Sequence, residues 1–159
     1  TEGKTPDDMV MKLALRKAEA TAALYPNDTN TIVSADTIVF CGGQLLGKPK
    51  DEEDAFNMLR MLSSRTHRVY TGVCIYNGPE KFLTFSEKTS VMFNYITDDE
   101  IRAYIKTGEP MDKAGAYAIQ GKGCVFVKGV RGDYYNVVGF PVSRFYLEYS
   151  EFKASKKYN

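Results

Sequence analysis

Apolar residues recur at helical spacing in two stretches of the chain, 9–24 and 55–62. Each stretch follows a residue that can cap a helix, Thr5 before the first and Asp51 before the second. The pattern therefore predicts two amphipathic helices, and the first is expected to end before the turn that begins at Pro26.

β-Branched and aromatic residues, in part alternating with polar ones, predict strands in other parts of the chain. The stretches with this character are 31–40, 68–76, 82–95, 114–119 and 124–130. A turn sequence at 77–79 joins the second stretch to the third and predicts a hairpin. Glycines separate the last two stretches, which are typical of a second hairpin.

Thr97 and Glu100 form a capping-box pattern that predicts a short helix to Thr107, and a last helix is expected over 139–149. Because helices and strands are interleaved while two strand pairs look like hairpins, we predict an α/β fold. Its mixed central sheet is flanked by helices, with two lobes around a cleft. The whole chain, 1–159, is expected to be one domain with a frayed tail at 153–159.

The charge balance excludes two classes of partner. The net charge is +1 over 159 residues, so no global field attracts nucleic acid or an anionic membrane. No window approaches the roughly 20 apolar residues of a membrane span. We expect neither a nucleic-acid nor a membrane partner, and any anionic ligand must be held by a local cluster of basic groups.

The cysteines and the single histidine offer little catalytic chemistry. Cys41, Cys74 and Cys124 are odd in number and far apart, which suits neither a zinc site nor a disulfide framework. A reducing compartment is therefore expected, with the cytoplasm as the default, and the three thiols are interpreted as small core residues. His67 is expected at the surface or at a strand edge rather than in catalysis.

Asp36 is the first candidate for chemistry, because it interrupts an apolar strand where a carboxylate is unusual. Lys48 follows on a loop shaped by Gly47 and Pro49. A carboxylate at a strand end and an ammonium on the next loop suit a metal-bound polyphosphate. A structural ion pair or a capping aspartate is the alternative, and the pair alone favours that alternative.

Two later segments add candidates for ligand binding. Small residues at 114–118 allow close approach to the backbone, and Gln120 after them offers a donor and an acceptor to a base edge. Asp112 and Lys113 form an opposite-charge pair before them. A turn held by this pair is the alternative, and composition favours it. The segment 132–141 suits either a pocket wall or an aromatic core edge.

Taken in order, these segments resemble the Maf family of nucleotide pyrophosphatases, relatives of the inosine triphosphate pyrophosphatases. The resemblance covers most of the chain, and its matching segments are 35–39, 47–49, 54–63, 66–67, 71–73, 108–110, 112–117, 119–121 and 135–141. It implies hydrolysis of a nucleoside triphosphate at the α–β linkage, with Mg²⁺ or Mn²⁺, and clearance of surplus nucleotides by a homodimer.

The resemblance also implies roles for individual residues. Asp36 is the general base that activates water, and the same carboxylate is a metal ligand in an alternative that the sequence leaves open. Thr37 and Gln120 are associated with substrate choice, and Lys48 and Lys113 with substrate binding. The Ile-Gln-Gly form at 119–121 resembles the subgroup that favours dTTP and UTP.

One departure from the family concerns the start of the chain. The family normally begins with a strand and a Ser-x-Ser-Pro-Arg-Arg loop that grips the triphosphate, followed by an Asp-Glu pair before the first helix. Neither is found after Thr1. Either the sequence is part of a longer protein, or much of the phosphate site is absent. A non-catalytic nucleotide-binding or cell-division regulatory module is therefore the alternative function.

Overall fold

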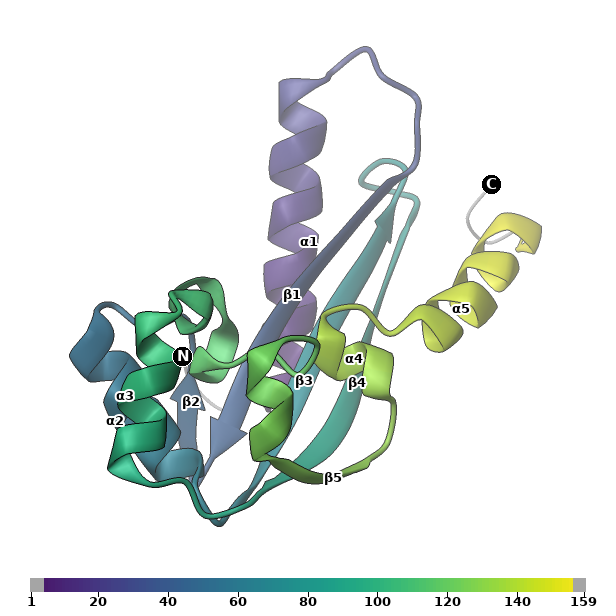
Figure 1. Cartoon of the computed structure of the whole chain (residues 1–159). Helices are drawn as coiled ribbons and strands as arrows, with labels where there is room; N and C mark the ends of the chain where they lie inside the picture. The colour runs from purple at the N-terminus through teal and green to yellow at the C-terminus, as the bar shows by residue number, and fades with distance from the viewer. Residues whose placement is uncertain (1–4, 156–159) are drawn as a thin grey trace.

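The computed structural model describes residues 5–155 and contains a five-stranded sheet in the order β2-β1-β3-β4-β5 (Figure 1). Every pairing in that sheet is antiparallel. The strands are β1 (Ile32–Cys41), β2 (Gln44–Leu46), β3 (Thr66–Tyr76), β4 (Phe82–Phe93) and β5 (Val127–Arg131). The α/β class with flanking helices is confirmed, whereas the expectation of a mixed sheet is wrong because all four pairings are antiparallel.

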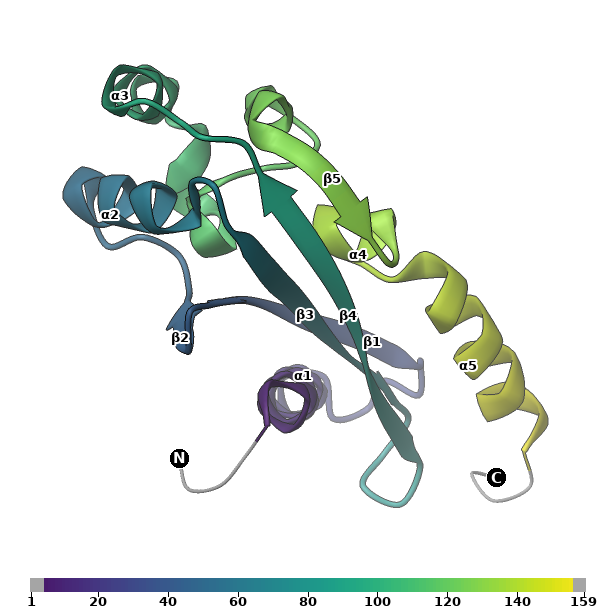
Figure 2. The same ribbon diagram turned by 90° about the horizontal axis from the view of Figure 1, so that it is seen from below.

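Helices cover both faces of the sheet. They are α1 (Pro6–Leu24), α2 (Glu52–Leu62), α3 (Asp98–Lys106), α4 (Tyr134–Val138) and α5 (Val142–Ala154). Figure 2 shows α1 on one side of the strands and α5 on the other. Side chains alternate along β3, so Cys74 packs against α1 whereas Val73 and Ile75 pack with Phe152 of α5.

The first helix lies on the sheet at very short range. Thr5 caps α1 in a reciprocal capping box with Asp8, as the sequence predicts. A Cβ atom built on Gly72 of β3 would lie 2.2 Å from the backbone carbon and oxygen of Val10. Only glycine therefore lets the helix backbone approach this strand so closely.

The larger core lies on the opposite face, between the sheet and α2 and α3. Leu59 and Leu62 of α2, Ile101 of α3 and Val91 of β4 are all fully buried in it. The side chain of Asp51 caps α2, and Thr97 caps α3 in a second capping box. Both helices thus begin where the sequence predicts.

The prediction of a second hairpin is wrong. Residues 114–119 form no strand: Ala114–Ala116 is a turn of 3-10 helix in which Gly115 has φ +73° and Ala116 has φ +63°. Two consecutive residues in the left-handed region turn the chain, which a strand cannot do. Lys122–Phe126 is also 3-10 helix, so strand β5 begins only at Val127.

Several smaller expectations also change. The hairpin of β3 and β4 is confirmed. The expected last helix over 139–149 corresponds to α5, which begins at Val142 and continues to Ala154, and the short helix α4 precedes it across a break at 139–141. The expected frayed tail is helical to Ala154, and its last residues, 156–159, lie outside the described part. Among residues 5–155, no helix combines the length and apolar character needed to cross a bilayer.

Strand β1 has a free edge beside the cleft described below. Its pairing with β2 is limited to the three positions Val39, Phe40 and Cys41. In the part of the chain that the structure describes, the outer edge of β1 before Val39 has no strand partner. Groups on both faces of β1 can therefore reach one space at this edge.

Candidate active site

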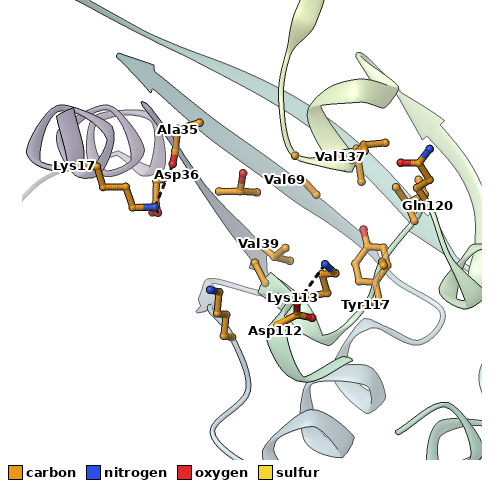
Figure 3. A pocket seen from close by; sticks show the side chains of 17 residues that line it. Lys17, Ala35, Asp36, Val39, Val69, Asp112, Lys113, Tyr117, Gln120 and Val137 are labelled. Carbon is orange, nitrogen blue, oxygen red and sulfur yellow. Dashed lines mark hydrogen bonds and ion pairs between the residues drawn. The ribbon is translucent and has the colours of Figure 1, made fainter. Parts of the chain in front are cut away.

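A cleft of about 380 Å³ lies at the free edge of β1 (Figure 3). Segments that are far apart in the sequence line it, and all five residues proposed from the sequence are among them. These five are Asp36, Thr37, Lys48, Lys113 and Gln120. The cleft also takes in Lys17, Asp112, Tyr117 and the segment 137–139.

Asp36 points to the face of the sheet that α1 covers, and its partner comes from that helix. The ammonium of Lys17 donates to the Asp36 carboxylate and also to the carbonyl oxygen of Ala35, at 3.1 Å. The Asp36 side chain is 21% exposed and that of Lys17 is 54% exposed. Both groups therefore remain within reach of a ligand. Asp36 is in an ion pair, as the alternative reading allows, but with Lys17 rather than Lys48.

One backbone hydrogen bond joins the two lysine-bearing loops, and a close approach to Val39 seats them on β1. The amide of Gly115 donates to the carbonyl oxygen of Gly47 at 3.0 Å, which places the Lys48 loop against the segment after Lys113. A Cβ atom on Gly115 would lie 3.0 Å from a methyl group of Val39 in β1. The same contact thus seats both loops on the strand that carries Asp36. The Lys113 ammonium lies 3.5 Å from the Asp112 carboxylate.

The loop that carries Gln120 is fixed by the Glu109 carboxylate. Glu109 accepts hydrogen bonds from the backbone amides of Lys122 and Gly123, each at 3.1 Å, and from the hydroxyl of Tyr104. Burial acts to raise the pKa of Glu109, but these hydrogen bonds outweigh burial and lower it below the usual value. A charged carboxylate therefore anchors the turn, and leaves the exposed Gln120 side chain free for a ligand.

Thr37 lies on the opposite face of β1 from Asp36 and belongs to a buried polar cluster. Its hydroxyl oxygen is 2.9 Å from that of Thr71, its cross-strand neighbour on β3. The Thr71 hydroxyl also donates to the backbone carbonyl of Asn136 in α4, at 3.5 Å. The Asn136 amide group donates to Thr89 and to two strand carbonyls, which docks α4 against the sheet.

His67 lies behind the cleft wall, so the expectation of a surface position is wrong. It is 1% exposed, and its Nε2 atom is 2.7 Å from the hydroxyl of Tyr117. Phe93 packs edge-on against both rings. Burial lowers the pKa of His67 to about 4, so the ring is neutral at physiological pH. It supports Tyr117 and does not contribute a charge.

The cleft has a charged end and an apolar end. Figure 3 shows Lys17 and Asp36 at one end and Gln120 and Val137 at the other, with Val69 and Val39 between them. Three lysines and two aspartates line the cleft, which leaves an excess of one positive charge. This arrangement suits an elongated ligand with an anionic part and a flat, weakly polar part.

Comparison with known proteins gives the family. The sequence model described as Maf-like protein matches residues 1–152. The chain belongs to the Maf family. It is 49% identical to the dTTP/UTP pyrophosphatase of Bacillus cytotoxicus, over 148 residues that cover 93% of this chain and 76% of the relative. The protein of the same name from Bacillus cereus strain AH187 is 50% identical over the same shares of the two chains.

Some parts of this Maf cleft were missed by sequence reasoning. Lys17 lies among other charged residues of the first helix, a pattern that predicts a solvent-exposed helix face. It reaches Asp36 because its side chain is long and α1 packs closely on the sheet. Tyr117 was placed in a strand that does not exist. Cys124, interpreted as a core residue, is exposed because its segment is 3-10 helix, whereas Cys41 and Cys74 are buried as expected.

A cation in the Maf cleft would need ligands from the substrate. Within residues 5–155 no three carboxylate, imidazole or thiol groups gather to hold a metal. The cleft supplies two carboxylates, Asp36 and Asp112. Mg²⁺ is commonly held by one or two carboxylates together with substrate phosphates and water, so the partly exposed carboxylate of Asp36 fits such an ion.

Proposed function

We propose that the protein is a nucleoside triphosphate pyrophosphatase that converts dTTP and UTP to the monophosphate and pyrophosphate, and so clears surplus nucleotides. The observation that carries this proposal is the two-ended cleft, which is lined by Asp36 and three lysines and in which Lys17 and Asp36 lie at the end away from Gln120 (Figure 3). The Bacillus relatives are named dTTP/UTP pyrophosphatases, which supports the choice of substrate.

The lysines bind and orient the triphosphate. Lys48 and Lys113 sit on two loops joined through Gly47 and Gly115, so their ammonium groups can act on one polyphosphate. Phosphoryl transfer needs positioning and charge stabilisation more than covalent help, which lysines can supply. The apolar wall with Gln120 takes the base, whose edge matches an amide that both donates and accepts.

Asp36 is the proposed general base. Its carboxylate is partly exposed in the cleft and held by Lys17, so it can take a proton from a water molecule beside the triphosphate. In the alternative role, the Asp36 carboxylate would hold Mg²⁺ or Mn²⁺ together with the phosphates of the bound nucleotide. The ion would supply neutralisation of the charge on the phosphates.

We also propose a cytoplasmic homodimer. The three free cysteines support a reducing compartment. Val142, Tyr146 and Leu147 of α5 are between 52% and 70% exposed, and their spacing places them on neighbouring parts of one helix. Association of two copies would cover such apolar side chains.

Replacement of Asp36 tests the proposal. Full-length wild type and the Asp36→Asn variant are incubated with UTP, dTTP and Mg²⁺, and pyrophosphate and phosphate are measured separately. We expect pyrophosphate from wild type and a loss of about 100-fold or more in kcat for Asp36→Asn, because a general base contributes on that order. Asp99→Asn, at the exposed start of α3, is the matched control and should retain activity.

Three results would overturn the proposal: release of phosphate in place of pyrophosphate, full activity of Asp36→Asn, or tight nucleotide binding by wild type without turnover. The last result would favour a regulatory nucleotide-binding module. Melting temperatures of the three proteins show whether a loss of activity reflects unfolding.

A further inference from the structure

The segment 118–123, called here the Gln120 loop, forms one wall of the cleft through Ala118, Ile119 and Gln120. Residues 117–121 belong to no helix or strand, and only the end of the loop enters the 3-10 helix that begins at Lys122. The backbone groups of the loop therefore need partners elsewhere in the molecule to hold one conformation. The position of this cleft wall depends on those partners.

Two side chains from outside the loop hold both of its ends. The Glu109 carboxylate accepts from the backbone amides of Lys122 and Gly123, at 3.1 Å each. The hydroxyl of Tyr104 donates to the same carboxylate, and its oxygen accepts from the backbone amide of Ala118 at 3.0 Å. One carboxylate–phenol pair thus joins the first residue of the loop to its last two.

The direction of each of these hydrogen bonds follows from the chemistry of the groups. A backbone amide only donates, so Tyr104 accepts from Ala118 and gives its one proton to Glu109. Three donors therefore point at the two oxygens of Glu109, an arrangement that suits an ionised carboxylate. In agreement with this, the pKa of Glu109 is lowered and that of Tyr104 is raised, so the first is charged and the second neutral at physiological pH.

The carboxylate–phenol pair is fastened to the core. Tyr104 lies on α3 and is 4% exposed, and its ring packs edge-on against that of Phe126. A Cβ atom on Gly123 would lie 2.7 Å from the carbonyl oxygen of Ala118 and 2.8 Å from the hydroxyl oxygen of Tyr104. Both ends of the loop are therefore packed tightly on Tyr104 as well as hydrogen-bonded to the pair.

We propose that Glu109 and Tyr104 are positioning residues that order the Gln120 loop before a ligand binds, and so set the affinity of the cleft for its nucleotide rather than the rate of hydrolysis. The inference rests on the proposed function, which supplies the ligand. A wall that is already ordered binds without the entropic cost of ordering it. Asp36 lies on β1 at the other end of the cleft, so the chemical step should not depend on the pair (Figure 3).

The test separates affinity from rate. The dissociation constant for α,β-imido-UTP with Mg²⁺ is measured by calorimetric titration of the full-length protein, and kcat is measured with UTP. Glu109→Gln places an NH₂ donor where three donors already point. We expect its dissociation constant to rise about tenfold, as for a loop that is competent to bind about one tenth of the time, and kcat to stay within about twofold of wild type.

Tyr104→Phe is a second variant and removes only the phenol hydroxyl. Its dissociation constant should rise by about threefold, because Glu109 still accepts from the amides of Lys122 and Gly123. Since both side chains act on one loop, the double variant should lose less affinity than the product of the two single losses. Melting temperatures show whether each variant is folded, and Tyr104→Phe decides the inference if Glu109→Gln is not.

Glu100→Gln is the matched control. The Glu100 carboxylate likewise accepts from a backbone amide and a hydroxyl, both of Thr97, but it does so at the start of α3. The change should leave the dissociation constant as in wild type. An unchanged constant in both Glu109→Gln and Tyr104→Phe, an equal rise in Glu100→Gln, or a fall in kcat without a change in affinity would overturn the inference.

Amide hydrogen exchange without ligand tests the loop directly. We expect the amides of Lys122 and Gly123 to exchange faster in Glu109→Gln than in wild type, with no change at Val10 in α1, and equal rates at the loop would contradict the inference. If wild type binds the analogue but does not hydrolyse UTP, the proposed function fails, and the dissociation constants still decide the inference. Turnover by wild type with unchanged affinity in the variants overturns the inference alone.

Discussion

At the scale of single residues, the buried histidine has the most clearly defined chemistry. His67 contacts Tyr117 through Nε2, and its Nδ1 atom has no hydrogen-bond partner in the described part of the chain. A protonated imidazole there would be a buried cation against two uncharged aromatic side chains, Tyr117 and Phe93. The pKa of His67 is accordingly lowered to about 4 by burial.

This lowered pKa predicts a pH dependence of stability. Between about pH 6.5 and 4 the unfolded chain protonates His67 and the folded chain does not, so the free energy of unfolding falls as the pH is lowered through this window. The contribution of His67 to that fall is roughly 3 kcal/mol at most. It is measured by urea unfolding at about pH 7 and about pH 4.5, for wild type and His67→Gln.

His67→Gln removes this titration and leaves all other titratable groups in place. Its loss of stability between the two pH values should therefore be smaller than that of wild type by roughly 2 kcal/mol. Equal losses in the two proteins would contradict the neutral, buried histidine. Any loss caused by the missing side chain itself affects both pH values and cancels in the comparison.

The sequence identifies candidate site residues more reliably than it identifies the side chains that contact them. Asp36 and Gln120 stand out because a carboxylate and an amide interrupt apolar or small-residue runs, and both line the cleft. The partner of Asp36 is nevertheless Lys17, 19 positions before it. His67 was misplaced because burial of a polar side chain depends on the hydroxyl of Tyr117, 50 positions away.

At the scale of elements, the approach of α1 to β3 sets the position of Lys17. Gly72 has room for only a hydrogen, and the backbone of Val10 fills the space where a Cβ would be. Val10, Ala14 and Ala18 are fully buried at this interface. Because Lys17 is on the same helix, any shift of α1 away from the sheet also moves the ammonium away from Asp36.

Gly72→Ala should therefore destabilise the fold by about 3 kcal/mol, the cost of forcing extra volume against backbone. Gly47→Ala is the control, because a Cβ there has nothing within 4 Å and φ is not in the left-handed region. It should change the free energy of unfolding by less than about 0.5 kcal/mol. Urea unfolding of the two variants measures the difference, and similar small effects would contradict the close helix–strand contact.

Helix starts were predictable from local sequence, whereas the segment 114–126 was not. Thr5, Asp51 and Thr97 cap their helices through side-chain bonds to residues three positions on, which a sequence shows directly. Ala114–Ala116 instead owes its turn to a hydrogen bond from Gly115 to Gly47. Such a bond joins loops more than 60 positions apart and leaves no local signature.

At the scale of the whole molecule, the cleft depends on the sheet order. Residues from α1, β1, two lysine-bearing loops and α4 meet because β1 lies next to β3 and, within residues 5–155, keeps a free edge. The α/β class follows from segments with helical spacing of apolar residues that alternate with segments typical of strands. The strand order and the antiparallel pairing depend on packing that no local pattern shows. Glu109 and Gly115, which fix the binding loops, would have been found only from the fold.

The central claim is that one cleft holds a nucleoside triphosphate with its phosphates near Asp36 and the lysines and its base near Gln120. A crystal structure of the full-length protein with α,β-imido-UTP and Mg²⁺ tests it most directly. We predict phosphate oxygens at hydrogen-bond distance from Lys48 and Lys113, the Asp36 carboxylate beside the ion or a water at the phosphates, and the uracil edge at Gln120. A nucleotide bound elsewhere, or with its base at Asp36, would contradict the claim.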